Sequence, residues 1–380
     1  MRPLEGKVAV VAGATRGAGR AIACTLGEAG ATVYCTGRSA RGARPPSGRP
    51  ETIDETAEMV AARGGTAIPV QTDHTDREQV RRLFERVEAE QGRLDVLVNN
   101  VNGDDLAEWG GAFWEQSLDQ GLRQLERGID SHVITIHTAL PFMLRGGRSG
   151  LIVGVTDRGA ISFFHGFVKQ SVMKLAELLA PELRPRGVAI VAVTPGYLRS
   201  EAMLERFGVT EATWRDAIKK DPYFAGSETP FYTGRAVAAL AADPRVMLKT
   251  GKTLASWTLA EEYGFTDVDG ARPHWERFMA PAIDEQWAKL AKQLRAEFRK
   301  HGADPHAVLE DDRVTLTLRA RVSADGEQPP RWLAQEIAWP ELFYGSRKQL
   351  VADFYERWAQ ARGAAAPAAG PPAAEEHATA

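Results

Sequence analysis

The sequence predicts an α/β protein with a doubly wound parallel sheet of the Rossmann type, followed by a C-terminal extension. Short Val-rich apolar segments alternate with helical segments from the start of the chain, and a glycine-rich turn follows the first apolar segment. These segments are apolar at successive positions, as strands are when helices cover both faces of a parallel sheet. Right-handed crossovers between such strands give a doubly wound sheet.

The apolar segments predict the strands of this sheet. They span residues 7–12, 31–35, 66–71, 94–98, 151–155 and 188–193, and residues 253–257 are a candidate for a further strand. Each segment is short and bounded by helical or turn-forming residues, which is typical of strands that alternate with helices.

Two of the connecting helices begin with the spacing of a capping box, in which a Thr and a Glu three residues later bond each other's backbone N–H groups. Thr52 with Glu55 predicts a helix that extends to about residue 63, and Thr75 with Glu78 predicts one that extends to about residue 91. A further long helical region ends near residue 144.

The character of the sequence changes after Pro273, so we expect residues 1–273 to form the sheet domain and residues 274–362 an extension. Residues 282–301 have the spacing of an amphipathic helix, and residues 314–322 alternate apolar and polar side chains as a half-exposed strand does. Residues 332–362 are aromatic-rich and partly helical. Residues 363–380 are mostly Ala, Pro and Gly, a composition that predicts disorder.

The composition argues against several classes of protein. The 380 residues include 47 Lys and Arg and 50 Asp and Glu, a net charge of −3, so the basic excess of nucleic-acid-binding proteins is missing. No apolar run reaches the ~20 residues that a membrane span needs. Cys24 and Cys35 are the two cysteines, which predict no disulfide scaffold and no Cys-based zinc site, and which suit the reducing cytoplasm. The histidine spacings predict no metal site.

A glycine-rich turn directly after the first strand indicates a dinucleotide site. It reads Gly13-Ala14-Thr15-Arg16-Gly17-Ala18-Gly19 and opens a helix. Glycines let the backbone turn tightly and approach a pyrophosphate, and the helix N-terminus offers free N–H groups and a positive dipole end. The alternative is a plain turn with incidental glycines, which the strand before it and the helix after it disfavour.

The spacing of these glycines, with further segments in the right order, resembles the short-chain dehydrogenase/reductase family. The further segments are Asp73 after the third strand, Asn99-Asn100-Val101-Asn102-Gly103 after the fourth, and Thr194-Pro195-Gly196 and Ser200 after the sixth. The resemblance covers about residues 4–273, and residues 262–264 and 267–270 are similar to the branch that includes dehydrogenase/reductase family member one. It implies a small-molecule substrate, a homodimer or homotetramer, and a dinucleotide held by Gly13, Thr15, Arg16, Gly17, Ala18, Gly19, Asp73, His74, Asn99, Val101, Lys169, Pro195, Gly196 and Ser200.

The second strand ends without the carboxylate that NAD sites use to bond the ribose 2′-OH. Arg38 follows instead, with Ser39 beside it, and is placed to meet a 2′-phosphate. Arg16 is placed to approach the same phosphate, for which the planar fork of an Arg is well suited. The sequence therefore predicts NADP(H) as the cofactor. The alternative is that both arginines are solvated surface residues.

The family's usual catalytic residues, a Ser after the fifth strand and a Tyr-x-x-x-Lys on the next helix, are altered in this chain. Lys169 matches the family's lysine, so His165 stands at the tyrosine position, and the serine position falls on Asp157 or Thr156. A His is a competent acid or base near neutral pH. A carboxylate at Asp157 favours a protonated His165, whereas the Lys169 ammonium disfavours it. Tyr197 is a further candidate acid.

Each of these residues has an alternative interpretation. His165 is a proton donor or a satisfied histidine on a helix without chemistry, and Asp157 is its partner or a cap. Lys169 is expected to bond the nicotinamide ribose. Thr156 is a candidate hydroxyl donor, and Tyr197 is a substitute acid or a wall of the nicotinamide pocket.

In the family, the segment that corresponds to residues 198–232 forms a mobile flap over the substrate. Its side chains therefore indicate what kind of substrate binds. Its large side chains either line a pocket for a fairly large, apolar substrate or pack between helices; they are Met203, Phe207, Trp214, Tyr223 and Phe224.

Three functions stay open: an NADPH-dependent reductase of a carbonyl, C=C or C=N group, a non-redox dehydratase, epimerase or cyclase, and a cofactor-binding protein without catalysis. The glycine turn and Lys169 favour the first, and the lost Tyr and Ser favour the others.

Overall fold

The computed structural model divides the chain into two compact units, Met1–Met279 and Ala280–Ala380. It describes residues 2–42, 48–103, 110–145, 149–157, 159, 161–300, 308–311, 316–321, 332–337 and 347–361. The tail for which the sequence predicts disorder lies outside the described residues.

The first unit is built on a seven-stranded sheet in the order β3-β2-β1-β4-β5-β6-β7. Its strands are β1 (Val8–Ala12), β2 (Thr32–Gly37), β3 (Thr66–Gln71), β4 (Val96–Asn99), β5 (Gly150–Val155), β6 (Val188–Thr194) and β7 (Thr253–Ala255). All neighbouring strands pair in parallel. The predicted fold class is confirmed, and the strand order reverses at β1, where α/β sheets of this type bind ligands.

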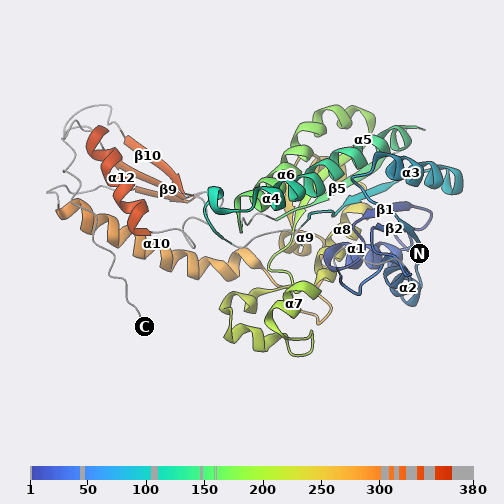
Figure 1. The fold of residues 1–380 in the computed structure, drawn as a ribbon, viewed down its shortest axis with the longest axis horizontal. Coiled ribbons are helices and arrows are strands. Elements are labelled where there is room, and N and C mark those ends of the chain that lie inside the picture. The colour runs from blue at the N-terminus through green and yellow to red at the C-terminus, as the bar shows by residue number, and fades with distance from the viewer. Residues whose placement is uncertain are drawn as a thin grey trace. The chain divides into compact units, whose positions relative to one another are not determined.

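Helices cover both faces of the sheet (Figure 1). One face carries α1 (Gly17–Glu28), α2 (Ile53–Ala62), α8 (Pro230–Ala242) and α9 (Ser256–Tyr263), and the other carries α3 (Arg77–Gln91), α5 (Ser131–Leu144) and α6 (Phe163–Leu183). The side chains of β1 alternate between the two cores: Ala9 and Val11 belong to the first, Val8 and Val10 to the second. Both faces of the strands β1, β2, β4, β5 and β6 are therefore largely buried, which explains why these strands are mostly apolar, whereas the edge strand β3 has no buried residue.

One of the two predicted capping boxes is confirmed. Thr52 Oγ1 accepts from Glu55 N at 3.2 Å, and Thr52 N donates to Glu55 Oε2 at 3.1 Å. The second is wrong, because Asp76 caps α3 through bonds from two amides of its first turn. The hydroxyl of Thr75 donates instead to Asp73 Oδ1 at 2.7 Å, so it is not available to the helix.

The elements after β5 also differ from the predictions. Strand β7 ends at Ala255 because α9 begins at Ser256, so the predicted strand is too long. Helix α10 spans Trp275–Lys300 and begins before the predicted residue 282. The remaining described α-helices of the first unit are α4 (Leu118–Leu125), which precedes β5, and α7 (Glu201–Phe207). Among the described helices, none combines the length and apolarity that crossing a bilayer requires.

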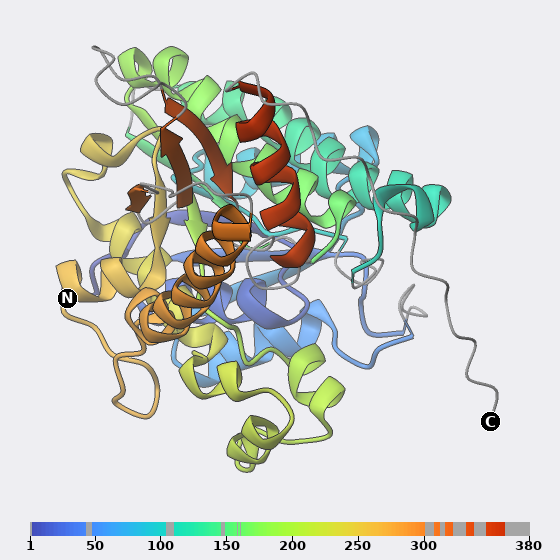
Figure 2. The same cartoon turned by 90° about the vertical axis from the view of Figure 1, so that its left-hand side faces the viewer.

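The second unit contains most of α10, an antiparallel three-stranded sheet and α12 (Arg347–Ala361). The sheet has the order β10-β9-β8, with β8 (Val308–Asp311), β9 (Leu316–Arg321) and β10 (Trp332–Ile337), so it has more strands than the one predicted. Figure 2 shows these strands with the two helices. The ring of Phe298 on α10 lies 4.7 Å from that of Trp358 on α12, so aromatic packing joins the two helices.

Candidate active site

The glycine turn between β1 and α1 is fixed to its neighbours by hydrogen bonds. Gly13 N and Ala14 N both donate to Thr36 O of β2, at 3.0 and 2.9 Å. Thr56 Oγ1 of α2 donates to Ala14 O at 2.8 Å. These bonds hold the turn at the carboxyl end of the central strand, where the strand order reverses.

Glycine is required at two positions of the turn by steric contact. A Cβ on Gly19 would lie 2.0 Å from Gly13 O and 2.8 Å from Asn100 Nδ2, and a Cβ on Gly13, whose φ is +80°, would lie 2.9 Å from Asn100 O. Real Cβ atoms do not approach other atoms so closely, and L side chains rarely adopt this φ. The bare backbone and the N-terminus of α1 together fit the pyrophosphate of a dinucleotide.

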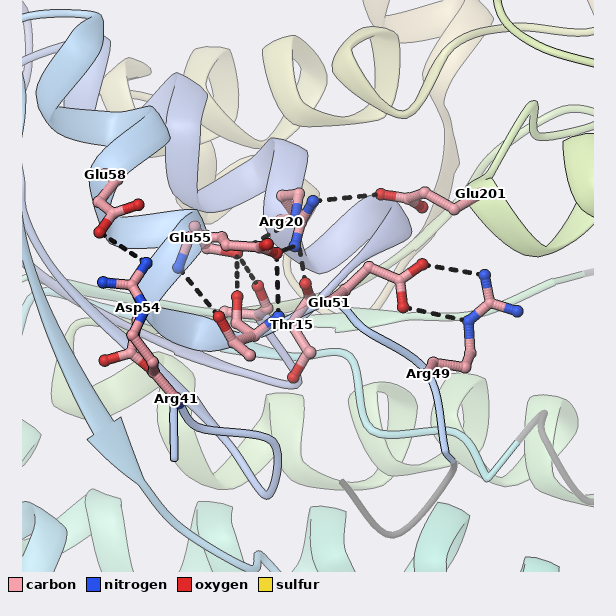
Figure 3. Close-up of polar contacts among 12 residues, drawn as sticks. Thr15, Arg20, Arg41, Arg49, Glu51, Asp54, Glu55, Glu58 and Glu201 are labelled. Carbon is pink, nitrogen blue, oxygen red and sulfur yellow. Dashed lines mark hydrogen bonds and ion pairs between the residues drawn. The ribbon is translucent and has the colours of Figure 1, made fainter. Parts of the chain in front are cut away.

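A carboxylate from α7, Glu201, bonds the first amide of α1 and lies close to Arg20 (Figure 3 shows the contact with Arg20). Arg16 occupies the N-cap position, but its side chain does not cap the helix. Gly17 N donates to Glu201 Oε2 at 2.8 Å, and Arg20 Nη1 lies 3.9 Å from Glu201 Oε1. Arg20 Nε also donates to Thr15 O at 3.0 Å. Glu201 follows Ser200 directly, but no sequence signal indicates its contact with the glycine turn.

Ser200 begins α7 and lies next to the same turn. Its Oγ accepts from Met203 N at 3.4 Å, and its Cβ is 3.7 Å from the position that a Cβ on Gly17 would take. Two segments distant in the sequence are thus brought together, as a shared cofactor site requires.

The loop after β2 holds Arg38, which is predicted to meet the 2′-phosphate, and Ser39, a further predicted cofactor-binding residue. Arg38 is half-buried and its carbonyl accepts from Gln71 Nε2 at 3.0 Å. Ser39 is buried, and its carbonyl accepts from Ile53 N at 3.0 Å. The backbone of this corner is therefore fixed to β3 and α2.

A buried carboxylate, Glu51, lies near Arg16. Arg49 holds it with two bonds, Nη2 to Oε1 at 2.9 Å and Nε to Oε2 at 3.2 Å. Burial acts to raise the pKa of Glu51, but the bonds from Arg49 and the charges of Arg49 and Arg16 outweigh it and hold this pKa below its ordinary value. The loop after β2 therefore does bring a carboxylate into range of Arg16, although none directly follows the strand.

His74 is enclosed in the protein, which corrects its assignment as a cofactor-binding side chain near adenine or solvent. It is 2% exposed, and its Nε2 and Nδ1 lie 2.8 Å from Thr36 Oγ1 and 2.9 Å from Thr135 Oγ1. Burial lowers the pKa of His74 to about 4, so the ring is neutral. Because Thr36 Oγ1 donates to Val11 O, it accepts from His74 Nε2. The neighbouring Asp73 accepts from Thr75 N at 3.0 Å and stays half-buried.

The segment after β4 packs against the glycine turn through Asn100, which is not among the predicted site residues. Asn100 N donates to Ala12 O at 2.9 Å and its Nδ2 to Gly13 O at 3.3 Å. Asn99 is buried and its Nδ2 donates to His132 O at 3.4 Å, so its side chain points to α5. Val101 O accepts from His132 Nε2 at 3.0 Å.

His165 and Lys169 lie one turn apart on α6, and each is 4% exposed. Ser162 caps this helix, with its Oγ accepting from His165 N. The structure corrects the assignment of Thr156 as a hydroxyl donor to the substrate. Thr156 is 2% exposed and its Oγ1 donates to Lys169 O at 2.7 Å, so the hydroxyl proton is already used to fix α6 to the end of β5.

Asp157 and Tyr197 have local partners that match their alternative interpretations. Asp157 Oδ1 accepts from Gly159 N at 2.8 Å and thus caps its own turn. Tyr197 Oη donates to Asp221 Oδ2 at 2.9 Å, and its ring packs edge-on against Trp275, with centroids 5.8 Å apart. Tyr197 follows Gly196 directly, so this part of the segment is fixed to Asp221 and Trp275.

Pro195 and Gly196 follow β6 and are held by a buried acid. Glu228 is 1% exposed; its Oε2 accepts from Gly196 N at 3.0 Å and Ser256 Oγ at 2.7 Å, and its Oε1 from Thr233 Oγ1 at 2.9 Å. Burial raises the pKa of Glu228 to about 7 against these bonds, which lower it. Glu228 thus ties Gly196 to α8 and α9, a role that no sequence signal indicates.

Three of the large side chains in the segment after Tyr197 pack together. Phe207 and Trp214 are 9% exposed and Phe224 is fully buried, and these three share one small core. Arg199 closes it with its guanidinium 4.3 Å from the Trp214 ring. Packing between helices, the second interpretation, therefore describes these three residues.

In the described part of the chain, no group of three or more His, Cys, Asp or Glu side chains is placed to hold a metal ion.

Comparison with known proteins adds independent information. The family model described as short chain dehydrogenase matches residues 7–208. The chain is 36% identical over 285 residues to dehydrogenase/reductase SDR family member 1 of Mus musculus, an alignment that covers 70% of this chain and 85% of that protein. A solved structure described as a short-chain dehydrogenase/reductase from Burkholderia xenovorans matches with a TM-score of 0.56 and 27% identity, over 67% of this chain and 96% of that one. An NADP-bound structure from Agrobacterium tumefaciens, at 24% identity and a TM-score of 0.53, shares the fold over 66% of this chain and 95% of that one.

Proposed function

The chain belongs to the short-chain dehydrogenase/reductase family of oxidoreductases, and from this premise we propose that it is an NADP(H)-dependent reductase. The proposed substrate is a fairly large, apolar molecule with a carbonyl, C=C or C=N group. The observation that carries the proposal is the glycine turn, where a Cβ on Gly19 would lie 2.0 Å from Gly13 O. This steric requirement leaves the backbone bare where an anionic cofactor binds a helix N-terminus.

The proposed cofactor contacts lie in the segments that follow the carboxyl ends of the strands. The backbone from Gly13 to Gly19 is proposed to hold the pyrophosphate, and Pro195, Gly196 and Ser200 to border the nicotinamide. Asp73, Asn99 and Val101 remain proposed contacts through the segments that follow β3 and β4. When bound, the dinucleotide supplies a hydride to the substrate.

The preference for NADP(H) rests on charge. Arg38 and Arg16 are the proposed partners of the 2′-phosphate, because their planar guanidinium groups pair with phosphate oxygens. Glu51 stands near Arg16, but its charge is already balanced by the two bonds from Arg49. We therefore keep Arg16 and Arg38 as the residues that select the phosphorylated dinucleotide.

We propose that His165 gives a proton to the substrate atom that becomes negative as reduction proceeds. A His is suited to this task near neutral pH. Lys169, buried one turn away on the same helix, is proposed to bond the nicotinamide ribose and to hold positive charge beside the developing anion. Asp157 is proposed to support the protonated His165 only by its charge, since it caps its own turn, and Tyr197 to line the pocket.

A second candidate function is a non-redox or non-catalytic protein on the same fold. The observation that favours it is that the hydroxyl of Thr156 donates to Lys169 O, which adds to the predicted loss of the family's tyrosine at His165. On this alternative, His165 and Asp157 act as acid and base in a dehydratase, epimerase or cyclase, or have no catalytic role.

The test is a titration with NADPH and NADH, followed by oxidation at 340 nm against ketones, imines and enones. NADPH binding with turnover supports the reductase, whereas binding without turnover supports the second candidate. We expect H165F to lower turnover about 100-fold or more, the size of general-acid effects, with NADPH affinity unchanged. Unchanged turnover in H165F would remove His165 from the mechanism.

We also propose that the protein forms a homodimer or homotetramer. Apolar side chains of Phe163 and Phe167 on α6 are each 49% exposed, and Leu122 on α4 is 52% exposed. Such clustered exposure is typical of interaction surfaces, and light scattering of the purified chain tests it. A cytoplasmic location remains our proposal, supported by the free and buried thiols of Cys24 and Cys35.

A further inference from the structure

Helix α7 carries two carboxylates that contact the region proposed for the dinucleotide. Glu201 and Glu205 lie one turn apart, so they share a face of the helix. Glu201 bonds Gly17 N at 2.8 Å and lies 3.9 Å from Arg20, whose second ion pair is with Glu55 at 3.0 Å. Figure 3 shows Glu201 reaching Arg20 from α7, across from the side chains of α2.

The second carboxylate reaches the loop that follows β2. Glu205 pairs with Arg49, the same residue that holds the buried Glu51 with two bonds. Glu205 is 69% exposed, so its pair with Arg49 is the weaker contact. Through the two residues, α7 is attached both to the glycine turn and to the loop beside Arg38.

The position of Glu201 is the one that an anionic ligand of α1 would occupy. Gly17 N is the first amide of the helix, it has no intrahelical acceptor, and it lies at the positive end of the dipole. A single N–H makes one strong hydrogen bond, and a carboxylate at contact distance repels a phosphate. A phosphate that bonds Gly17 N must therefore displace Glu201.

We propose that Glu201 is an internal mimic of the cofactor phosphate, which together with Glu205 latches α7 onto the glycine turn until the dinucleotide displaces it. The inference rests on the proposed function, since it names what sets the affinity of that same site. It makes cofactor affinity depend on a carboxylate outside the glycine turn. The latch also couples cofactor binding to release of α7, which is the first helix of the segment that follows Tyr197.

The test compares E201Q, E205Q and the control E177Q in NADPH titrations of the full chain. Gln keeps the shape of Glu201 but loses the charge, so its bond to Gly17 N is weaker and it does not repel phosphate. We expect E201Q to bind NADPH about five- to tenfold more tightly than the wild type does. This factor is smaller than the loss of a full charged hydrogen bond would give, because Glu201 is partly exposed. We expect E205Q to bind NADPH about twofold more tightly than the wild type does. Glu177 pairs with Lys174 on the surface, so E177Q is expected to bind as the wild type does.

Hydrogen exchange gives a readout independent of affinity. In the wild type, NADPH is expected to speed exchange of the amides in residues 201–207, and in E201Q they exchange fast without NADPH. Equal or weaker NADPH binding by E201Q, or slower exchange on binding in the wild type, would overturn the latch.

The latch and the proposed function fail in different ways. If the wild type binds neither NADPH nor NADH, the proposed function is wrong, and titration with inorganic pyrophosphate then tests the latch. Tighter pyrophosphate binding by E201Q than by the wild type supports the latch, and equal binding refutes it.

Discussion

The substitution E228Q tests how a buried acid beside Gly196 makes stability depend on pH. The pKa of Glu228 is about 7 in the folded protein against an ordinary value of 4.5, because burial disfavours its charged form. That difference of about 2.5 corresponds to roughly 3 kcal/mol. Since the folded-state pKa is raised, this contribution to stability is complete below about pH 4.5 and is lost as pH rises through about 7.

The glutamine variant has the same size but does not titrate. Its Oε1 is able to accept from Gly196 N and Ser256 Oγ, and its amide nitrogen is able to donate to Thr233 Oγ1, so all three contacts of Glu228 are kept, with the direction of the bond to Thr233 reversed. We expect the unfolding free energy of the wild type to fall by about 2 kcal/mol more than that of E228Q between pH 5.5 and 8.5.

The assay is urea unfolding of the full chain at several pH values, followed by tryptophan fluorescence. E177Q serves as the control, because Glu177 is exposed and its loss is expected to leave the pH dependence unchanged. Parallel curves for E228Q and the wild type would refute the reasoning, since they would mean that Glu228 stays charged in the folded protein at pH 5.5.

Two further substitutions test the cofactor site. We expect G19A to bind NADPH at least about tenfold more weakly and to lose about 1–3 kcal/mol of stability, because the added Cβ would lie 2.0 Å from Gly13 O; G264A, where a Cβ meets nothing within 4 Å, is its control for affinity. Unchanged NADPH affinity in G19A would contradict the fit of the turn to pyrophosphate. R38A is expected to weaken NADPH binding about tenfold and NADH binding little, because only NADPH carries the 2′-phosphate. Equal losses for both dinucleotides would show that Arg38 does not select between them.

Much of the fold was predictable because its signals are local. Burial of both sheet faces makes β1, β2, β4, β5 and β6 mostly apolar, so the sequence predicts them as short apolar segments, whereas the more exposed edge strand β3 is less apolar. The glycine turn was equally visible, since its geometry is set by residues within one segment. The capping box of Thr52 is local in the same way, and the structure confirms it. At α3 the N-cap is Asp76 and not the predicted Thr75, because Asp76 directly precedes the helix.

The candidate site was less predictable, because the role of a side chain depends on partners far away in the chain. His74 was assigned to the cofactor from its position after β3, but Thr36 and Thr135 enclose it. Thr156 was expected to serve the substrate, but its hydroxyl bonds the carbonyl of Lys169.

The α/β architecture and the glycine turn follow from the sequence alone, which also predicts that His165 stands at the family's tyrosine position. Only the tertiary structure decided which side chains meet those elements: Glu201 at Gly17, Glu51 near Arg16, and Glu228 at Gly196. The physical reason is that glycine geometry and apolar periodicity act within one segment. The contacts of a carboxylate are instead decided by where the folded sheet brings the ends of different strands and helices together.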